Sequence, residues 1–155
     1  MFESQTHIQD VAEFILQSLG PLSAMKLQKL VYYCQAWSLV WNDRPLFPES
    51  IEAWANGPVA PDLFAKHRGQ FLVRSGDLGG RPEHIDKIGQ ETIEAVLNYY
   101  GSWNAQQLSD LTHAEAPWII TREGLEPGSS SDRPISWDVM AEYYANLPPD
   151  EESST

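Results

Sequence analysis

The sequence predicts a mainly α-helical protein, a compact helical bundle around a buried central helix, with one possible short β-hairpin. Three observations support this fold class. Apolar residues recur at helical spacing in several stretches, two-residue alternation is almost absent, and residues 23–41 are apolar on two sides. The chain has 155 residues, of which 42% are hydrophobic, enough for one domain. We place that domain at residues 1–147. We expect the acidic tail, residues 148–155, to be disordered because it lacks apolar anchors.

The first two predicted helices carry most of the apolar pattern. Thr6 and Gln9 match a capping box for a helix over residues 7–19, and Phe14 lies opposite its apolar stripe. Phe14 is therefore either covered by another element or exposed. Ser23 can cap a second helix that reaches about residue 41. Its two apolar faces leave only a narrow strip to face solvent, which consists of Lys26, Lys29, Tyr33 and Val40.

Shorter elements follow. Residues 50–54 are the best candidate for a strand, before a turn at residues 56–58, and Pro61 suits the first turn of a short helix. The glycine-rich residues 74–82 predict a mobile loop. Further helices are predicted over residues 87–100, after Asn104, from Pro117, and after Ser136. The last helix should dock on the core through Trp137, Met140, Ala141 and Tyr144.

Charge and cysteine content exclude several classes of protein. Asp and Glu number 22 against 10 Lys and Arg, giving a net charge of −12, which argues against direct binding to nucleic acid or to an anionic membrane. Cys34 is the single cysteine, so no internal disulfide or thiolate zinc site can form. No apolar run approaches the ~18 residues of a membrane helix. We expect a cytoplasmic protein.

No reaction follows from the sequence. Cys34 lies on an apolar helix face and is expected to act as a small hydrophobe. The histidines are scattered, without the close pairs typical of metal ligands. We therefore predict no catalytic residue, no metal site and no cofactor. His113 should fix the corner between two short helices by hydrogen bonds. The alternative is a small hydrolase that uses His113 as a general base with Glu115.

Aromatic side chains are the remaining clue to function. The chain contains six Trp, six Tyr and five Phe, and a domain of this size can hardly bury every ring. Because Tyr and Trp are enriched as anchors of protein interfaces, the residues favour a protein-binding module.

Several short stretches resemble the Panacea domain of SocA-like and GepA-like proteins, in the same order along residues 7–147. These stretches are Lys26-Leu-Gln-Lys-Leu-Val-Tyr-Tyr33, Pro45-Leu-Phe47, Ile51-Glu-Ala-Trp54, Asn56-Gly-Pro-Val59 with Pro61, and Leu108-Ser-Asp-Leu-Thr-His113 with Glu115 and Pro117-Trp118. Many relatives have a more aromatic stretch at Ala55-Asn56, and the acidic tail is not shared.

The resemblance implies an antitoxin of a toxin–antitoxin system, often carried by prophages and linked to phage defence. Such a protein neutralises a cognate protein toxin by direct contact on a mainly helical fold. Family members pair with dissimilar toxins, among them enzymes that modify tRNA and small membrane-active proteins. The family has no catalytic centre to carry over. The negative charge favours a basic partner, such as an RNA-modifying enzyme. An adaptor that delivers the toxin to a protease is the alternative, and the oligomeric state stays open.

Because most of the shared positions are expected to shape the fold, we expect the partner-binding surface to lie at less constrained, exposed positions. We expect it to comprise Lys26, Lys29 and Tyr33 on the solvent-facing strip of the second helix, together with Phe14 if that ring is exposed.

Overall fold

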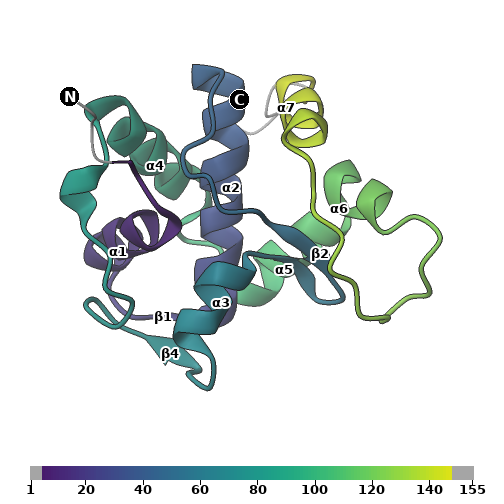
Figure 1. Ribbon diagram of the computed structural model, residues 1–155, viewed down its shortest axis with the longest axis horizontal. Helices are drawn as coiled ribbons and strands as arrows, with labels where there is room; N and C mark the ends of the chain where they lie inside the picture. The colour runs from purple at the N-terminus through teal and green to yellow at the C-terminus, as the bar shows by residue number, and fades with distance from the viewer. Residues whose placement is uncertain (1–4, 148–155) are drawn as a thin grey trace.

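The computed structural model describes residues 5–147 and confirms a mainly α-helical fold with a short hairpin (Figure 1). Within these residues the helices and strands are α1 (Ile8–Leu19), β1 (Leu22–Ser23), α2 (Ala24–Asn42), β2 (Glu52–Trp54), β3 (Gly57–Val59), α3 (Pro61–His67), β4 (Leu72–Val73), η1 (Pro82–His84, a 3-10 helix), α4 (Lys87–Tyr100), α5 (Ala105–His113), α6 (Ala116–Thr121) and α7 (Trp137–Ala145). The predicted disordered tail, residues 148–155, lies outside the described residues.

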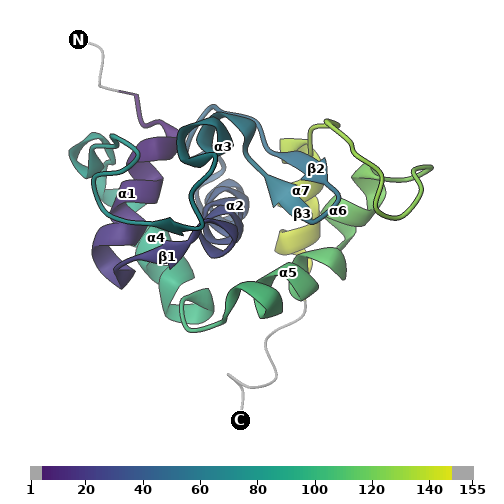
Figure 2. The same ribbon diagram turned by 90° about the horizontal axis from the view of Figure 1, so that it is seen from below.

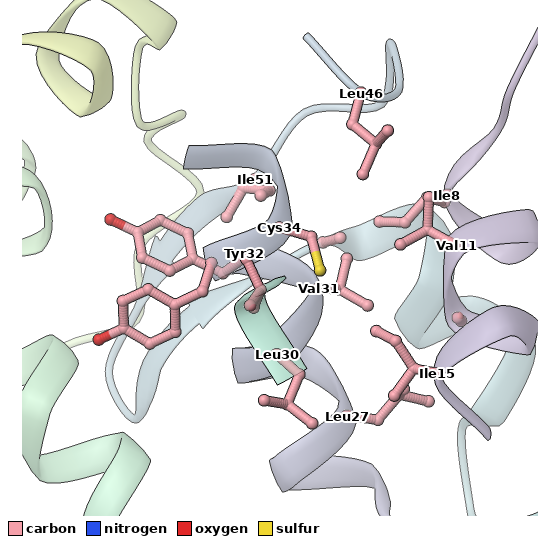
Figure 3. Packing of buried hydrophobic residues seen from close by; sticks show 14 of the residues in the cluster. Ile8, Val11, Ile15, Leu27, Leu30, Val31, Tyr32, Cys34, Leu46 and Ile51 are labelled. Carbon is pink, nitrogen blue, oxygen red and sulfur yellow. The ribbon is translucent and has the colours of Figure 1, made fainter. Parts of the chain in front are cut away.

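Helix α2 is the centre of the fold. It stands between α1 and α4 on one side and α6 and α7 on the other in Figure 1, and Figure 2 looks along it. Every residue from 27 to 36 is buried, as expected for a helix that has packed neighbours all round. Figure 3 shows Val11 and Ile15 of α1 facing Leu27 and Val31 of α2.

The solvent-facing strip predicted on α2 is wrong for two of its residues. Lys29 is 2% exposed and Tyr33 is 0% exposed. The hairpin covers Lys29, since a Cβ placed on Gly57 would lie 2.8 Å from Lys29 Cε. Tyr33 is covered by Tyr100, whose ring stacks on it with centroids 4.1 Å apart. Lys26 is half-buried. Amino-acid spacing defines the faces of a helix but does not reveal which elements will cover them.

The predicted helix starts are largely confirmed, because capping is local chemistry. Ser23, Asn104 and Ser136 each accept a hydrogen bond from a main-chain amide in the first turn of α2, α5 and α7. Helix α1 differs from the prediction. Its N-cap is His7, whose amide donates to Asp10 Oδ2 at 2.8 Å, and Thr6 instead donates its hydroxyl to the carbonyl of His84.

Two small antiparallel ladders complete the fold. The predicted hairpin is formed by β2 and β3, with Trp54 opposite Gly57, and Gly57 has φ +119°, a backbone conformation that favours glycine. The pairing of β1 with β4 was not predicted. Strands of two residues each are too short to show alternation in the sequence.

Buried polar side chains hold the irregular segments in place. Gln35 accepts from the amides of Leu46 and Phe47 and donates to the Phe47 carbonyl. Glu13 accepts from Ser75 and from the amide of Gly76. The loop over residues 74–82, expected to be mobile, is thus anchored on α1 by a carboxylate. The buried carboxylate of Glu13 thus has the hydrogen-bond donors that a buried acceptor requires.

The structure shows where two aromatic residues of uncertain or predicted position lie. Trp137 was predicted to face the core, but its side chain is 41% exposed, and Met140 and Tyr144 carry the contact of α7 with the core instead. Phe14 is half-buried and packs against the core. Of the two alternatives for Phe14, covered or exposed, the structure therefore shows a partly covered ring.

Candidate partner-binding site

A groove with aromatic walls crosses the carboxyl half of α2, the end of α4 and α7. We call it the aromatic groove. Its volume is about 880 Å³, and it is lined by Trp37, Val40, Trp41, Ala95, Val96, Tyr99, Tyr100, Trp103, Leu111, Ala114, Glu115, Tyr143, Tyr144, Ala145 and Leu147. Trp41 and Tyr99 are 50% and 49% exposed. The groove therefore presents large rings to solvent, the side chains that most often anchor protein interfaces.

The rings of the groove are fixed by one another. Trp37 stacks on Trp41 with centroids 5.1 Å apart, and its indole N–H donates to the hydroxyl of Tyr100 at 3.1 Å. Tyr99 meets Tyr100 edge to face. A surface whose side chains are already ordered loses little conformational entropy when a partner binds.

Glu115 lines the aromatic groove and is itself buried. Its Oε1 accepts hydrogen bonds from the hydroxyls of Tyr33 at 2.8 Å and Tyr144 at 2.6 Å, and no hydrogen bond to Oε2 occurs within residues 5–147. Burial raises the pKa of Glu115 to about 7, against the two hydroxyls, which favour the charged form. The wall of the groove thus carries an acid that is about half ionised near neutral pH.

The tyrosines around Glu115 remain neutral donors. Burial, with the nearby Glu115 carboxylate as a further cause, raises the pKa values of Tyr33 and Tyr144 well above the usual tyrosine range. Tyr32 extends the network, because its hydroxyl lies 3.0 Å from that of Tyr144. This network joins α2 to α7 beside the groove.

His113 fixes its corner by hydrogen bonds, as predicted. Nδ1 lies 2.7 Å from the carbonyl oxygen of Ser109, and Nε2 lies 3.2 Å from that of Ala55. Its ring packs on Trp118, whose indole N–H donates to the Trp54 carbonyl. Both ring nitrogens thus face main-chain oxygens, and no hydrogen bond joins His113 to Glu115 within the described chain.

Cys34 and the possible metal ligands were the other candidate reactive groups of the described chain. Cys34 is fully buried, as expected, and burial raises the pKa of its thiol, the opposite of what a nucleophile needs. In the part of the chain that the structure describes, no three His, Cys, Asp or Glu side chains form a group suited to a metal ion. Over the same residues, no helix is both long and apolar enough to cross a membrane.

The residues predicted to bind a partner do not line the aromatic groove. Tyr33 contacts two of its lining residues, Glu115 and Tyr100, whereas Phe14, Lys26 and Lys29 are not among the lining residues. The groove residues missed by the sequence reasoning include Trp41, Tyr99, Trp103 and Tyr143. The excess of aromatic residues was the available signal. It indicated that some rings are exposed but not which ones.

Comparison with known proteins identifies the family. Residues 27–119 match the family described as "Antitoxin SocA-like, Panacea domain". The chain belongs to this family. It is also 33% identical over 124 residues to Antitoxin SocA of Caulobacter vibrioides (strain NA1000 / CB15N), an alignment that covers 71% of this chain and 64% of that protein. The match therefore covers less than two thirds of the length of the curated relative. No solved structure matches the chain.

Proposed function

We propose that this protein is an antitoxin that neutralises a protein toxin by direct contact, and that the aromatic groove is the surface that binds the toxin. Membership of the SocA-like family supports the first part. The observation that carries the second part is the pair of rings, Trp41 and Tyr99, left about half exposed beside the 880 Å³ groove. Ordered rings around a hollow form the usual centre of a protein interface.

The groove also indicates the chemistry of its partner. Its walls are aromatic and apolar. Among the described residues that line it, Glu115 is the one acidic side chain, and its Oε2 accepts no hydrogen bond from them. A segment with apolar side chains and one Arg or Lys would satisfy both features, because a cation can reach the carboxylate and lie against the rings. The net charge of −12 likewise favours a basic toxin through complementary fields.

Coexpression with the product of the adjacent gene, tested as the candidate toxin, tests the proposal. We expect Trp41→Ala and Tyr143→Ala to weaken copurification of the toxin and to abolish protection of the cells. Phe71→Ala is the matched control, because Phe71 is 82% exposed yet lies beside β4, away from the groove. Thermal unfolding should show that the variants remain folded. Full protection by both folded groove variants would refute the proposed surface, and failure of the wild type to bind would refute the function.

The same coexpression assay distinguishes neutralisation by direct contact from delivery of the toxin to a protease. We propose that residues 1–147 suffice as the binding domain, so a chain ending at residue 147 should protect as well as the full chain and leave toxin abundance unchanged. If the tail instead serves as a handle for proteolysis, its removal will lengthen the half-life of the toxin. Loss of protection by a folded His113→Gln variant that still binds would favour the enzyme alternative.

The sequence-based surface remains a prediction for its two accessible residues. Phe14 and Lys26 are half-buried, so either could contact a toxin that extends beyond the groove. Lys29 and Tyr33 could do so only after the elements that cover them move.

A further inference from the structure

A second cavity opens beside the amino half of α2. Its volume is about 790 Å³, and its lining residues are Ala24, Met25, Gln28, Lys29, Glu52, Trp54, Ala55, Asn56, Val59, Phe64, His67, Ser130, Ser131 and Asp132. None of them lines the aromatic groove. Figure 2 shows α3 and the β2–β3 hairpin on adjoining sides of α2 around this region. The volume falls within the ~300–1,000 Å³ typical of sites for small ligands.

Lys29 is the unusual residue of this cavity. Its side chain is 2% exposed and ends against Gly57, where an added Cβ would lie 3.2 Å from Nζ. Within residues 5–147, Lys29 makes no ion pair and no hydrogen bond. Burial lowers its pKa to about 8, so most molecules carry the ammonium at neutral pH. Nζ itself still has some accessible surface, because among the described residues no fully buried side-chain nitrogen or oxygen lacks a hydrogen-bond partner. An ammonium so largely removed from water and without a partner is unfavourable for folding, and a ligand that supplies the partner would offset that penalty.

Neighbouring polar groups are already engaged with one another. Gln28 accepts from the Ala60 amide through Oε1, and its Nε2 donates to the Ala60 carbonyl and lies 3.0 Å from His67 Nε2. Because Gln28 Nε2 can only donate, His67 Nε2 must accept, which requires the neutral ring. Burial also lowers the pKa of His67. Among the described residues that line the cavity, Lys29 is therefore the only side chain that carries a positive charge at neutral pH.

The remaining walls define the ligand further. Trp54 and Phe64 pack edge to face with centroids 5.1 Å apart and give the cavity an aromatic wall. Glu52 and Asp132 also belong to the lining, and their carboxylates disfavour a polyphosphate or any ligand with several negative charges. One buried cation, aromatic walls and acidic groups together suit a single negative charge on an apolar body.

We propose that this cavity is a binding site for a carboxylate attached to an apolar group, with the carboxylate paired to Lys29 Nζ and the apolar group against Trp54 and Phe64. A small organic acid and the carboxyl terminus of a peptide share this chemistry. The proposal does not depend on the toxin-binding role of the groove, because the two sites have no lining residue in common.

The test is an NMR titration of the full-length protein with lysine side chains labelled, using 3-phenylpropanoate and 3-phenylpropanamide as matched probes. We expect the acid to shift the Lys29 Cε resonance saturably and to raise the pKa of Lys29 by about one unit or more, while the amide does neither. The shift should vanish in Lys29→Met and persist in Lys26→Met, because Lys26 lies on the same helix but donates to the Gly101 carbonyl.

Two further comparisons complete the test. One identifies the source of the carboxylate, and the other gives a result even if the Lys29→Met variant does not fold. An acetylated tripeptide that ends in phenylalanine is compared with its amidated form. Stronger binding of the free-carboxyl peptide than of the small acid would assign the ligand to a chain terminus, and the reverse would assign it to a small molecule. The acid–amide comparison in wild-type protein needs no variant. Equal shifts with acid and amide, no shift with any acid, or tighter binding of inorganic phosphate would overturn the proposal.

Discussion

At the scale of residues, two buried side chains of opposite charge have pKa values that are shifted towards neutral pH. Glu115 lies among tyrosines in the aromatic groove, and Lys29 lies in the second cavity. Burial raises the pKa of Glu115 to about 7 and lowers that of Lys29 to about 8. Both shifts bring titration close to neutral pH, so the stability of the fold depends on pH through these residues.

Glu115→Gln tests the first of these effects. The pKa of Glu115 is raised from 4.5 to about 7 on folding, so between these pH values the folded state binds more protons than the unfolded state. Stability should therefore fall as pH rises from 4.5 to 7, by an amount on the order of 3 kcal/mol at ~1.4 kcal/mol per unit. Urea unfolding at the two ends of this range should show a smaller fall for Glu115→Gln than for wild type. Glu91→Gln, at an exposed position on α4, should behave as wild type. An equal fall in all three proteins would contradict this account.

The sequence showed on which side of α2 Lys29 and Tyr33 lie, but not which other elements would cover them. Lys29 and Tyr33 occupy the side of α2 that the apolar pattern left free, yet both are buried. Gly57 approaches Lys29 from the hairpin, and Tyr100 reaches Tyr33 from α4. Such contacts join residues far apart in the chain, and helical spacing carries no information about them.

At the scale of elements, the helices could be predicted and the connections could not. Helix starts depend on local capping side chains such as Ser23 and Asn104, which are visible in the sequence. The β1–β4 ladder pairs Leu22 with Val73, and the loop after β4 is held by Glu13 of α1. These long-range contacts have no local pattern, which is why the loop was expected to be mobile.

The packing of this loop on α1 gives a prediction for two adjacent glycines. A Cβ on Gly80 would lie 1.8 Å from the carbonyl oxygen of Gln9, so Gly80→Ala must displace the loop from α1. Gly79 has φ +75° but open space around its Cα; Gly79→Ala should therefore cost only the ~1 kcal/mol of a left-handed alanine. Chemical unfolding should show Gly80→Ala to be the less stable variant by at least ~1 kcal/mol. Equal stability of the two would show that the loop does not pack against α1 as described.

At the scale of the whole molecule, strong negative charge is combined with an exposed aromatic groove. The aromatic groove is assembled from α2, α4, α7 and the residues around α5, so its position could not be derived from any single stretch. The sequence did indicate two relevant properties of the chain, namely its excess of aromatic side chains and its net charge of −12. These two properties should govern different steps of toxin binding.

Salt should therefore change the rate of association more than the rate of dissociation. Long-range attraction between an acidic antitoxin and a basic toxin is screened as ionic strength rises, whereas apolar contacts in the groove are not. We expect the association rate constant to fall by about tenfold between 0.05 and 0.5 M salt, with little change in dissociation, in stopped-flow or surface-binding kinetics. An association rate that does not depend on salt would count against a basic partner.

Hydroxyl-radical footprinting of the protein with and without its toxin tests the central claim most directly, because it reports which side chains the toxin covers. Trp41 and Tyr99, each about half exposed in the free protein, should become several-fold less reactive in the complex. Phe71, 82% exposed and remote from the groove, should react as before. Unchanged reactivity of Trp41 and Tyr99 in a saturated complex, with protection at Phe14 instead, would contradict toxin binding in the aromatic groove.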